Sequence, residues 1–204
     1  DSMDVVIEGT RWVFTKLPDG VVGFEPEVVG EACLSFWDEI FEGMAVPSQG
    51  QDIPHDLFQG ENFYLNRKKS IDSRYEQIKQ INLPEFINDK IKLAEGSWTR
   101  LLYNGDQDML AYSKLTIVQE FISRISSEAF AKIVYRIAQN PNENRSGLSD
   151  FVIWNDRELI MVEVKKVREQ LRESQKLWLS WMLEENIPVE IVRVKGVPIM
   201  NPKT

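Results

Sequence analysis

The segment that decides the fold reads Asp150-Phe151-Val152-Ile153-Trp154, then a polar link, then Leu159-Ile160-Met161-Val162-Glu163-Val164-Lys165. Two short apolar runs joined by a link that contains Asn155-Asp156 are typical of two paired strands. Because side chains alternate along a strand, Glu163 and Lys165 are predicted to share one face of it. A tight turn between the two strands can bring Asp150 beside that face.

The residues after this segment predict one helix and one further strand. We expect a helix from Arg168 to Glu185, where Trp178 and Met182 are among the apolar residues that recur at helical spacing. Asn186-Ile187-Pro188 ends this helix, and residues 189–194 have the composition of a strand. Residues 140–197 therefore predict a β-β-α-β unit.

Residues 1–139 predict a mainly helical region. Apolar residues recur at helical spacing over residues 26–41, 63–93 and 115–138, and Ser126-Ser127 indicates that the last stretch is two helices. A loop rich in Pro, Gly and Gln separates the first two stretches at residues 46–60, and residues 12–14 favour a short strand or turn. The predicted fold class is α/β: a small mixed sheet flanked by helices in a single domain, residues 1–204, with an additional helical amino-terminal region.

Composition excludes several classes of protein. A chain of 204 residues, 43% hydrophobic and 27% charged, has the usage of a globular domain rather than of a disordered or fibrous protein. With one cysteine and one histidine, Cys33 and His55, the chain has no internal disulfide, multi-cysteine metal site or two-histidine zinc site. It shows no signal-peptide pattern and no apolar run of the ~20 residues that span a membrane, so we expect an intracellular protein without a membrane partner.

The net charge of −8 is unevenly distributed along the chain. Residues 1–62 hold 13 acidic and two basic residues, whereas residues 63–204 hold 22 basic and 19 acidic residues. The carboxyl-terminal part can therefore face a polyanion such as DNA although the whole chain is acidic.

Asp150, Glu163 and Lys165 form the candidate catalytic site. Carboxylates supply the hard oxygen ligands that Mg²⁺ or Mn²⁺ prefers, and such a metal neutralises a phosphate and lowers the pKa of a bound water. A lysine beside them can orient that water or stabilise developing charge. An aspartate followed about a dozen residues later by Glu-x-Lys is the signature of PD-(D/E)xK nucleases. The alternative is an ion pair at the end of a strand, and the position between two apolar runs favours the nuclease.

A longer pattern around this site resembles the VRR-NUC (virus-type replication-repair nuclease) domain and, within that group, the Fanconi-associated nuclease family. The family has Asn-Arg-x-Gly-Leu-Pro-Asp-Leu where this chain has residues 144–151. Its Val-Glu-Val-Lys matches residues 162–165, and its Gln-x-x-Trp-Leu matches residues 175–179.

The resemblance extends upstream of the site. Residues 36–41 are similar to the family's Leu-Trp-Asp-x-Ile-Phe helix. Residues 54–57 and 63–67 are similar to its Pro-Leu-Asp-Leu and Phe-Tyr-x-x-Arg. The pattern covers about residues 20–195, which is nearly the whole chain.

The resemblance implies a role for each residue of the site. By this likeness Asp150, Glu163 and the carbonyl of Val164 would hold Mg²⁺ or Mn²⁺. Lys165 would position the attacking water, and Gln175 would support the site.

The family also places a metal-site glutamate at the start of the helix that ends in Trp-Asp. Counting back from Trp37 reaches Phe24, so we assign this role to the neighbouring Glu25, with Glu27 and Glu31 as alternatives. Acidic residues are also common at helix amino termini because they interact favourably with the helix dipole.

Two positions depart from the family pattern. Ser149 replaces the proline before the aspartate, which we expect to be tolerated because that proline makes no metal contact. The family's Gly-Pro-x-Asp after the lysine reads Lys166-Val167-Arg168-Glu169 here, which affects the geometry toward DNA more than the metal site.

Basic residues surround the predicted site. Arg145, Lys166, Arg168 and Arg172 are expected to contact DNA phosphates. For Arg168 and Arg172, a solvated helix face with pairs three or four residues apart explains the charges equally well.

The expected function is metal-dependent hydrolysis of DNA phosphodiesters. The resemblance implies structure-selective cutting near 5′ ends or flaps, on branched DNA or single-strand/double-strand junctions. It also implies interstrand crosslink repair, repair-protein partners, and a nuclear location if the source is eukaryotic or a cytoplasmic one if it is bacterial. The alternatives are a degenerate nuclease fold that binds DNA or a protein, and a restriction-type defence nuclease.

Overall fold

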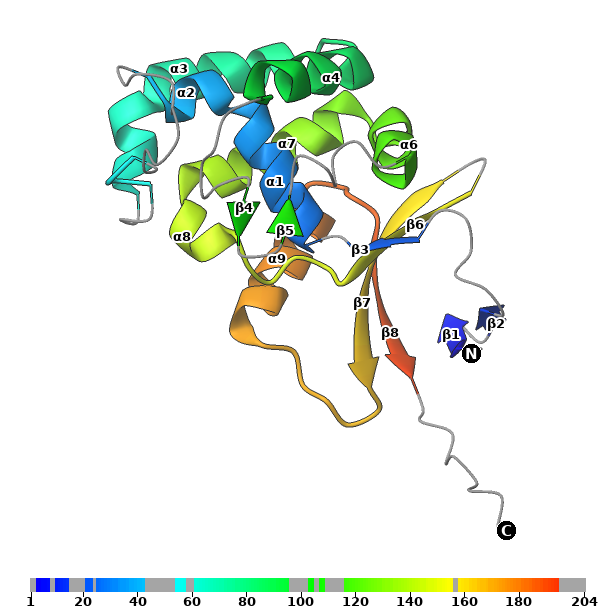
Figure 1. Cartoon of the computed structure of the whole chain (residues 1–204). Helices are drawn as coiled ribbons and strands as arrows, with labels where there is room; N and C mark the ends of the chain where they lie inside the picture. Colours follow the sequence, from blue (N-terminus) through cyan, green and yellow to red (C-terminus); the bar gives the residue numbers. More distant parts are fainter. Residues whose placement is uncertain are drawn as a thin grey trace.

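A computed structural model describes residues 3–7, 10–14, 21–23, 25–42, 54–57, 61–95, 103–104, 107–108, 116–155 and 158–194 (Figure 1). Most of the loop predicted at residues 46–60 lies outside this description, apart from a turn at residues 54–57. Within the described part, none of the helices combines the length and the apolar character that crossing a bilayer requires.

Helices dominate the first two thirds of the described chain, as predicted. They are α1 (Glu25–Ser35), α2 (Trp37–Ile40), α3 (Asn62–Ile78), α4 (Leu83–Ala94), α6 (Thr116–Arg124), α7 (Ser127–Gln139) and α8 (Pro141–Asn144). The break predicted at Ser126 is confirmed, because its hydroxyl accepts the Ala129 amide at 3.1 Å and caps α7. Asn82 caps α4 in the same way through the amide of Glu85, at 3.3 Å.

Among the described residues, the main sheet has four strands in the order β3-β6-β7-β8. Their bounds are β3 (Val21–Gly23), β6 (Phe151–Trp154), β7 (Leu159–Lys166) and β8 (Val189–Val194). β6 is antiparallel to both of its neighbours, β3 and β7. β8 runs parallel to β7 after the crossover helix α9 (Glu173–Glu184). The predicted β-β-α-β order is therefore present. The sheet also contains β3, which was not predicted because a run of three residues is too short to show a strand pattern.

Two further strand pairs are small and antiparallel. β1 (Met3–Ile7) pairs with β2 (Thr10–Phe14), and β4 (Tyr103–Asn104) pairs with β5 (Gln107–Asp108). The short strand favoured at residues 12–14 is the second half of β2.

The predicted start of the last helix is wrong. The chain leaves β7 through a turn in which the Glu169 amide donates to the Lys166 carbonyl at 2.9 Å. α9 begins only after Arg172, whose amide donates to the Gln175 side chain at 3.0 Å. Arg168 and Arg172 thus precede the helix, so the helix-face explanation of their charges does not apply.

One apolar core joins the helices to one face of the sheet. α1 packs against α4 and α7, and α3 packs along α7 (Figure 1). Val152 and Met161 extend from the sheet into this core, together with Trp178 of α9. Val162 and Val192 belong to a separate, smaller cluster, as the alternation of side chains along a strand requires.

Candidate active site

Strand register sets Asp150 opposite Glu163. Phe151 pairs with Val162 in the antiparallel β6–β7 ladder, so the next step outward matches Asp150 with Glu163. Residues directly opposite in such a ladder have their side chains on the same face, roughly 5 Å apart at Cβ. The Val164 amide also donates to Asp150 Oδ2 at 2.8 Å, which ties the aspartate to β7.

Glu163 and Lys165 lie on the same face of β7 as the core residue Met161, because positions two apart share a face. Glu163 is 0% exposed and Lys165 is 5% exposed. Burying charges costs several kcal/mol each unless they are paired and hydrogen-bonded. The strand therefore carries two charged groups where apolar ones are the stable choice, and such groups are typical of functional sites.

The two oxygens of Glu163 have different surroundings. Oε1 accepts a hydrogen bond from Gln175 Nε2 at 2.5 Å and pairs with Lys165 Nζ at 2.6 Å. Oε2 is buried and has no hydrogen-bond partner among the described residues. A buried carboxylate oxygen without a partner is costly, and a bound cation is one group that would satisfy it.

Burial and neighbouring charges have opposing effects on the pKa values of Glu163 and Lys165. Burial raises the pKa of Glu163 and the charge of Asp150 adds to the rise, against the opposing effects of Lys165 and Arg172. Burial lowers the pKa of Lys165, but its hydrogen bond to Glu163 and the charges of Glu163, Glu169 and Asp150 outweigh this and raise it. Lys165 is therefore an ammonium cation at neutral pH.

The donor set at this end of the sheet fits Mg²⁺ or Mn²⁺. The free oxygen of Glu163 and the carboxylate of Asp150 are hard oxygen donors. The N–H and C=O of one strand residue point to the same side, so the Val164 carbonyl faces the side on which its amide contacts Asp150. Two carboxylates and one backbone carbonyl are thus the oxygen donors available at this end of the sheet.

The upstream glutamate is placed by backbone alone. Gly23 at the end of β3 pairs with Phe151, so the chain that continues into α1 emerges at the sheet end where Asp150 lies. Glu25 is the first residue of α1, and the side chains of Glu25 and Glu27 lie outside the described part of the structure. Among the described residues no three acidic, His or Cys side chains gather at one point, so Glu31 does not join Asp150 and Glu163.

A loop before β6 fixes the position of Asp150. Asn144 Nδ2 donates to the Arg136 carbonyl of α7 at 2.7 Å. Gly147 has a backbone φ of +94° and lies so close to α9 that a Cβ there would be 2.7 Å from the Ser174 backbone. The Asn-Arg-x-Gly part of the family pattern thus corresponds to a loop that precedes Asp150 and β6. This loop packs closely against the start of α9.

The four predicted DNA-contacting residues are exposed. Arg145 follows α8, Lys166 ends β7, Arg168 lies in the turn after β7, and Arg172 precedes α9. Arg172 is near enough to lower the pKa of Glu163. Their role in binding DNA stays a prediction.

Two residues that the sequence did not single out also belong to this region. Glu169 Oε1 lies 3.4 Å from Lys165 Nζ, and its Oε2 accepts the Lys166 amide at 3.3 Å. Glu169 occupies the place of the family's aspartate in Gly-Pro-x-Asp, and this match could have identified it from the sequence. Arg193 of β8 contacts the same turn through backbone carbonyls, and no local pattern marks it.

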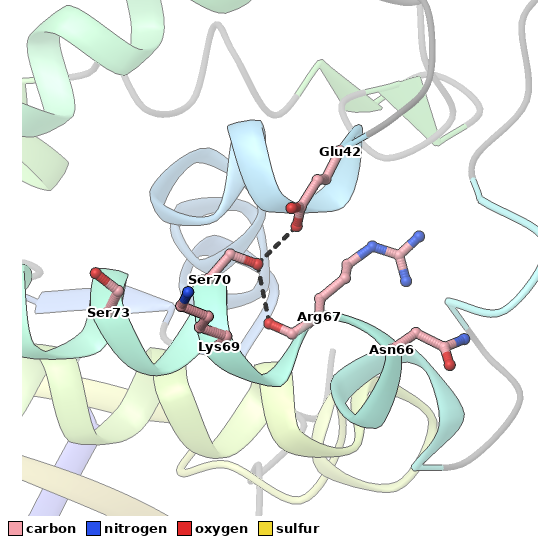
Figure 2. Close-up of a pocket in the computed structure, with 6 residues that line it drawn as sticks. All are labelled: Glu42, Asn66, Arg67, Lys69, Ser70 and Ser73. Atoms are coloured by element: carbon pink, nitrogen blue, oxygen red, sulfur yellow. Dashed lines mark hydrogen bonds between the residues drawn. The ribbon is translucent and has the colours of Figure 1, made fainter.

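A separate hollow of about 410 Å³ lies along α3 (Figure 2). Ser70 Oγ there is 2.6 Å from Glu42 Oε2 and 2.9 Å from the Arg67 carbonyl oxygen. The remaining lining residues are Asn66, Lys69 and Ser73. None of the predicted site residues lines this hollow, so it is not the catalytic site.

A mixed sheet with Asp150, Glu163 and Lys165 at one end defines the PD-(D/E)xK type of nuclease fold. The chain belongs to the VRR-NUC domain family, whose model matches residues 89–196.

Curated relatives and solved structures agree with this assignment. The chain is 30% identical to the Fanconi-associated nuclease 1 homolog of Caenorhabditis briggsae, over 80% of this chain and 19% of that protein. It is 27% identical to the homolog of Schizosaccharomyces pombe, over 79% and 23%. The chain thus spans about a fifth of the length of these relatives.

The fold itself is similar to that of paFAN1 in its crystal structure bound to 1-nucleotide 5′-flap DNA with a gap. The TM-score is 0.71 at 20% identity, over 87% of this chain and 32% of that chain. The structure of paFAN1 with 2-nucleotide 5′-flap DNA gives a TM-score of 0.66 at 21% identity. These likenesses confirm the predicted fold class.

Proposed function

We propose that this chain hydrolyses DNA phosphodiester bonds with the help of Mg²⁺ or Mn²⁺. The observation that carries the proposal is the buried Glu163, one oxygen of which is fixed by Gln175 and Lys165 while the other has no partner among the described residues. With Asp150 opposite, the free oxygen is suited to a divalent cation. Glu25 and the Val164 carbonyl would complete the ligand set.

When bound, the metal would neutralise the scissile phosphate and lower the pKa of a water molecule. The chain itself supplies orientation and charge. Gln175 fixes the plane of the Glu163 carboxylate from α9. Lys165 holds a positive charge beside that carboxylate, where it can orient the attacking water and stabilise the charge that develops on the phosphate.

We propose DNA with a 5′ end or flap as the substrate, including branched DNA and single-strand/double-strand junctions. Two similar solved structures are of paFAN1 bound to 5′-flap DNA, which supports this choice. Arg145, Lys166, Arg168 and Arg172 would contact phosphates at the edge of the site. We also propose a role in DNA repair, including interstrand crosslink repair with repair-protein partners, inside the cell and in the nucleus of a eukaryote. The name of the relatives, Fanconi-associated nuclease 1 homolog, supports the nuclease part of this proposal.

A second candidate is a degenerate nuclease fold that binds DNA or a protein without cutting. The observation in its favour is the turn Lys166-Val167-Arg168-Glu169, which replaces the family's Gly-Pro-x-Asp at the edge of the site. The retained Asp150, Glu163 and Lys165 favour catalysis.

Cleavage of 5′-labelled flap and single-stranded DNA distinguishes these functions. We expect the wild-type chain to cut with Mn²⁺ and not with EDTA, and Lys165→Ala to lose cutting. Lys176→Ala is the matched control because Lys176 is exposed on α9 and pairs only with the exposed Glu173 in the described structure. A wild type that neither cuts DNA nor binds Mn²⁺ would contradict the nuclease and support the binding module.

A further inference from the structure

Arg193 makes an unusual contact with the turn that departs from the family pattern. Its Nη1 donates to the Glu169 carbonyl at 3.0 Å, to the Lys166 carbonyl at 3.2 Å and to the Val167 carbonyl at 3.5 Å. Three backbone carbonyls of one turn therefore converge on one guanidinium nitrogen. Arg193 comes from β8, more than twenty residues later in the chain, so the contact fixes the turn from outside.

The strand register explains why Arg193 reaches this place. In the parallel β7–β8 ladder Lys165 pairs with Arg193. Val192, the residue before it, is 1% exposed and belongs to the small cluster on the opposite face of the sheet. Arg193 therefore lies on the same face as Glu163 and Lys165, at the edge of the site.

The turn that Arg193 holds is connected to Lys165 through Glu169. The Glu169 carboxylate accepts the Lys166 amide with Oε2, and its Oε1 lies 3.4 Å from Lys165 Nζ. The Lys165 ammonium is thereby placed between Glu163 and Glu169. A shift of the turn would move Glu169 and release one side of the lysine.

Sequence gives a reason for such an external contact. A Gly-Pro turn is stiff because proline fixes its own φ angle, and Lys166-Val167 lacks that constraint. A side chain that binds the carbonyls of the turn can restore the rigidity.

We infer that Arg193 is a positioning residue that holds the Lys166–Glu169 turn so that Glu169 keeps Lys165 in its catalytic place. This inference rests on the proposed nuclease function. It assigns Arg193 a role in the rate of cutting rather than in the binding of DNA, because its Nη1 is bonded to three carbonyls of its own chain.

Steady-state cleavage of flap DNA with Mn²⁺ tests the inference. We expect Arg193→Ala and Glu169→Gln each to lower kcat by about tenfold, because small displacements of a catalytic group reduce the rate, with KM changed less than about twofold. The double variant should be no slower than the slower single variant, because both changes break the same connection. Arg193→Lys should retain more activity than Arg193→Ala, because one nitrogen makes all three hydrogen bonds and an ammonium has three donors.

Arg124→Ala is the matched control, because Arg124 is an exposed arginine on α6 and its loss changes the net charge equally. Full additivity of the two single variants, or a raised KM with an unchanged kcat, would overturn the inference.

Hydrogen exchange separates this inference from the proposed function. The amides of Lys166 and Glu169 are both bonded within the turn, so Arg193→Ala should speed their exchange and Arg124→Ala should not. Unchanged exchange would overturn the contact itself, whatever the activity. A wild-type chain that cuts no DNA would overturn the nuclease and the positioning role together, while faster exchange in Arg193→Ala would still establish that Arg193 holds the turn.

Discussion

Gly147 shows how one residue fixes the distance between two parts of the site. Its φ of +94° is a region that side-chain-bearing residues rarely adopt, and an added Cβ would meet Ser174 atoms at 2.7–2.8 Å. We predict that Gly147→Ala lowers the free energy of unfolding by at least about 2 kcal/mol, from backbone strain and the clash. Chemical denaturation followed by fluorescence measures this.

The exposed neighbour Ser146 offers a control for this prediction, since Ser146→Ala changes the same loop at an open position. Equal stability of Gly147→Ala and Ser146→Ala would show that the loop moves away from α9 without cost.

Asp150 is predicted to reduce the stability of the metal-free protein and to be required for activity. Its charge raises the pKa of Glu163, so the two carboxylates repel each other when both are ionised. Asp150→Asn keeps an acceptor for the Val164 amide but removes the charge. We expect a melting temperature equal to or above that of the wild type in EDTA, no stabilisation by Mn²⁺, and loss of cleavage by at least about a hundredfold.

Thermal melts of both proteins with EDTA and with Mn²⁺ measure this effect. A wild-type protein that Mn²⁺ does not stabilise would contradict a metal site at Asp150 and Glu163. A strong loss of stability in Asp150→Asn without metal would instead assign Asp150 a structural role.

The α3–α7 pair is held by a polar network as well as by apolar packing. Asp72 of α3 accepts hydrogen bonds from Tyr64 at 2.8 Å and from Tyr135 of α7 at 2.7 Å, and it also pairs with Lys68. Burial would raise the pKa of Asp72, but the hydrogen bonds from Lys68, Tyr135 and Tyr64 outweigh burial and lower it. The ionised carboxylate is therefore the form that stabilises the packing of these helices.

This network predicts a pH-dependent loss of stability in Asp72→Asn. A carboxyl whose pKa is lower in the folded state stabilises the protein above the ordinary value of 3.8, and the effect disappears as the pH falls through the folded value. We expect Asp72→Asn to cost about 1 kcal/mol at pH 7 and less at pH 3, because only the charged form makes the stronger bonds. Urea unfolding at both pH values measures the difference.

Asp89 provides the matched control for Asp72, because it pairs with Lys92 on the exposed face of α4. Asp89→Asn should change stability little at either pH. An Asp72→Asn effect as large at pH 3 as at pH 7 would assign the cost to shape rather than to charge.

Elements with a clear period were predictable from sequence, and elements set by distant contacts were not. Ser126 predicted the start of α7 because its hydroxyl caps an amide only three residues away. The alternation of side chains around Met161 and Glu163 predicted β7 and its buried face. The first turn of α9 was misplaced because the turn at Lys166 depends on Arg193, which is remote in sequence. That Asp150 lies opposite Glu163 could not be predicted without the strand register. That one Glu163 oxygen lacks a partner among the described residues could not be predicted without the packing of α9.

For the whole molecule, internal pairing explains where basic charge remains available. Arg74 of α3 pairs with Asp38 at 2.7 Å and with Glu39 at 2.8 Å. Lys90 of α4 also pairs with Asp38, and Arg67 pairs with Asp56 at 2.7 Å. The basic residues of α3 and α4 thus pair with three acidic residues of the first third, Asp38, Glu39 and Asp56, whereas the basic residues at the edge of the site are exposed.

This distribution of basic residues predicts that the chain binds DNA weakly and that its affinity falls with salt concentration. If Arg145, Lys166, Arg168 and Arg172 each contact one phosphate, the logarithm of the association constant should fall with the logarithm of salt concentration at a slope of roughly −3 to −4. Replacing one contact, as in Lys166→Ala, should flatten that slope by about 1 and weaken binding similarly for every DNA sequence. Fluorescence anisotropy with labelled flap DNA in EDTA measures binding without cleavage.

Lys92→Ala is the control, because it removes the same charge from the exposed face of α4. Its slope should equal that of the wild type if DNA lies at the edge of the site and not along the helices. A slope that flattens equally in both variants would show that the chain responds to DNA through its overall charge.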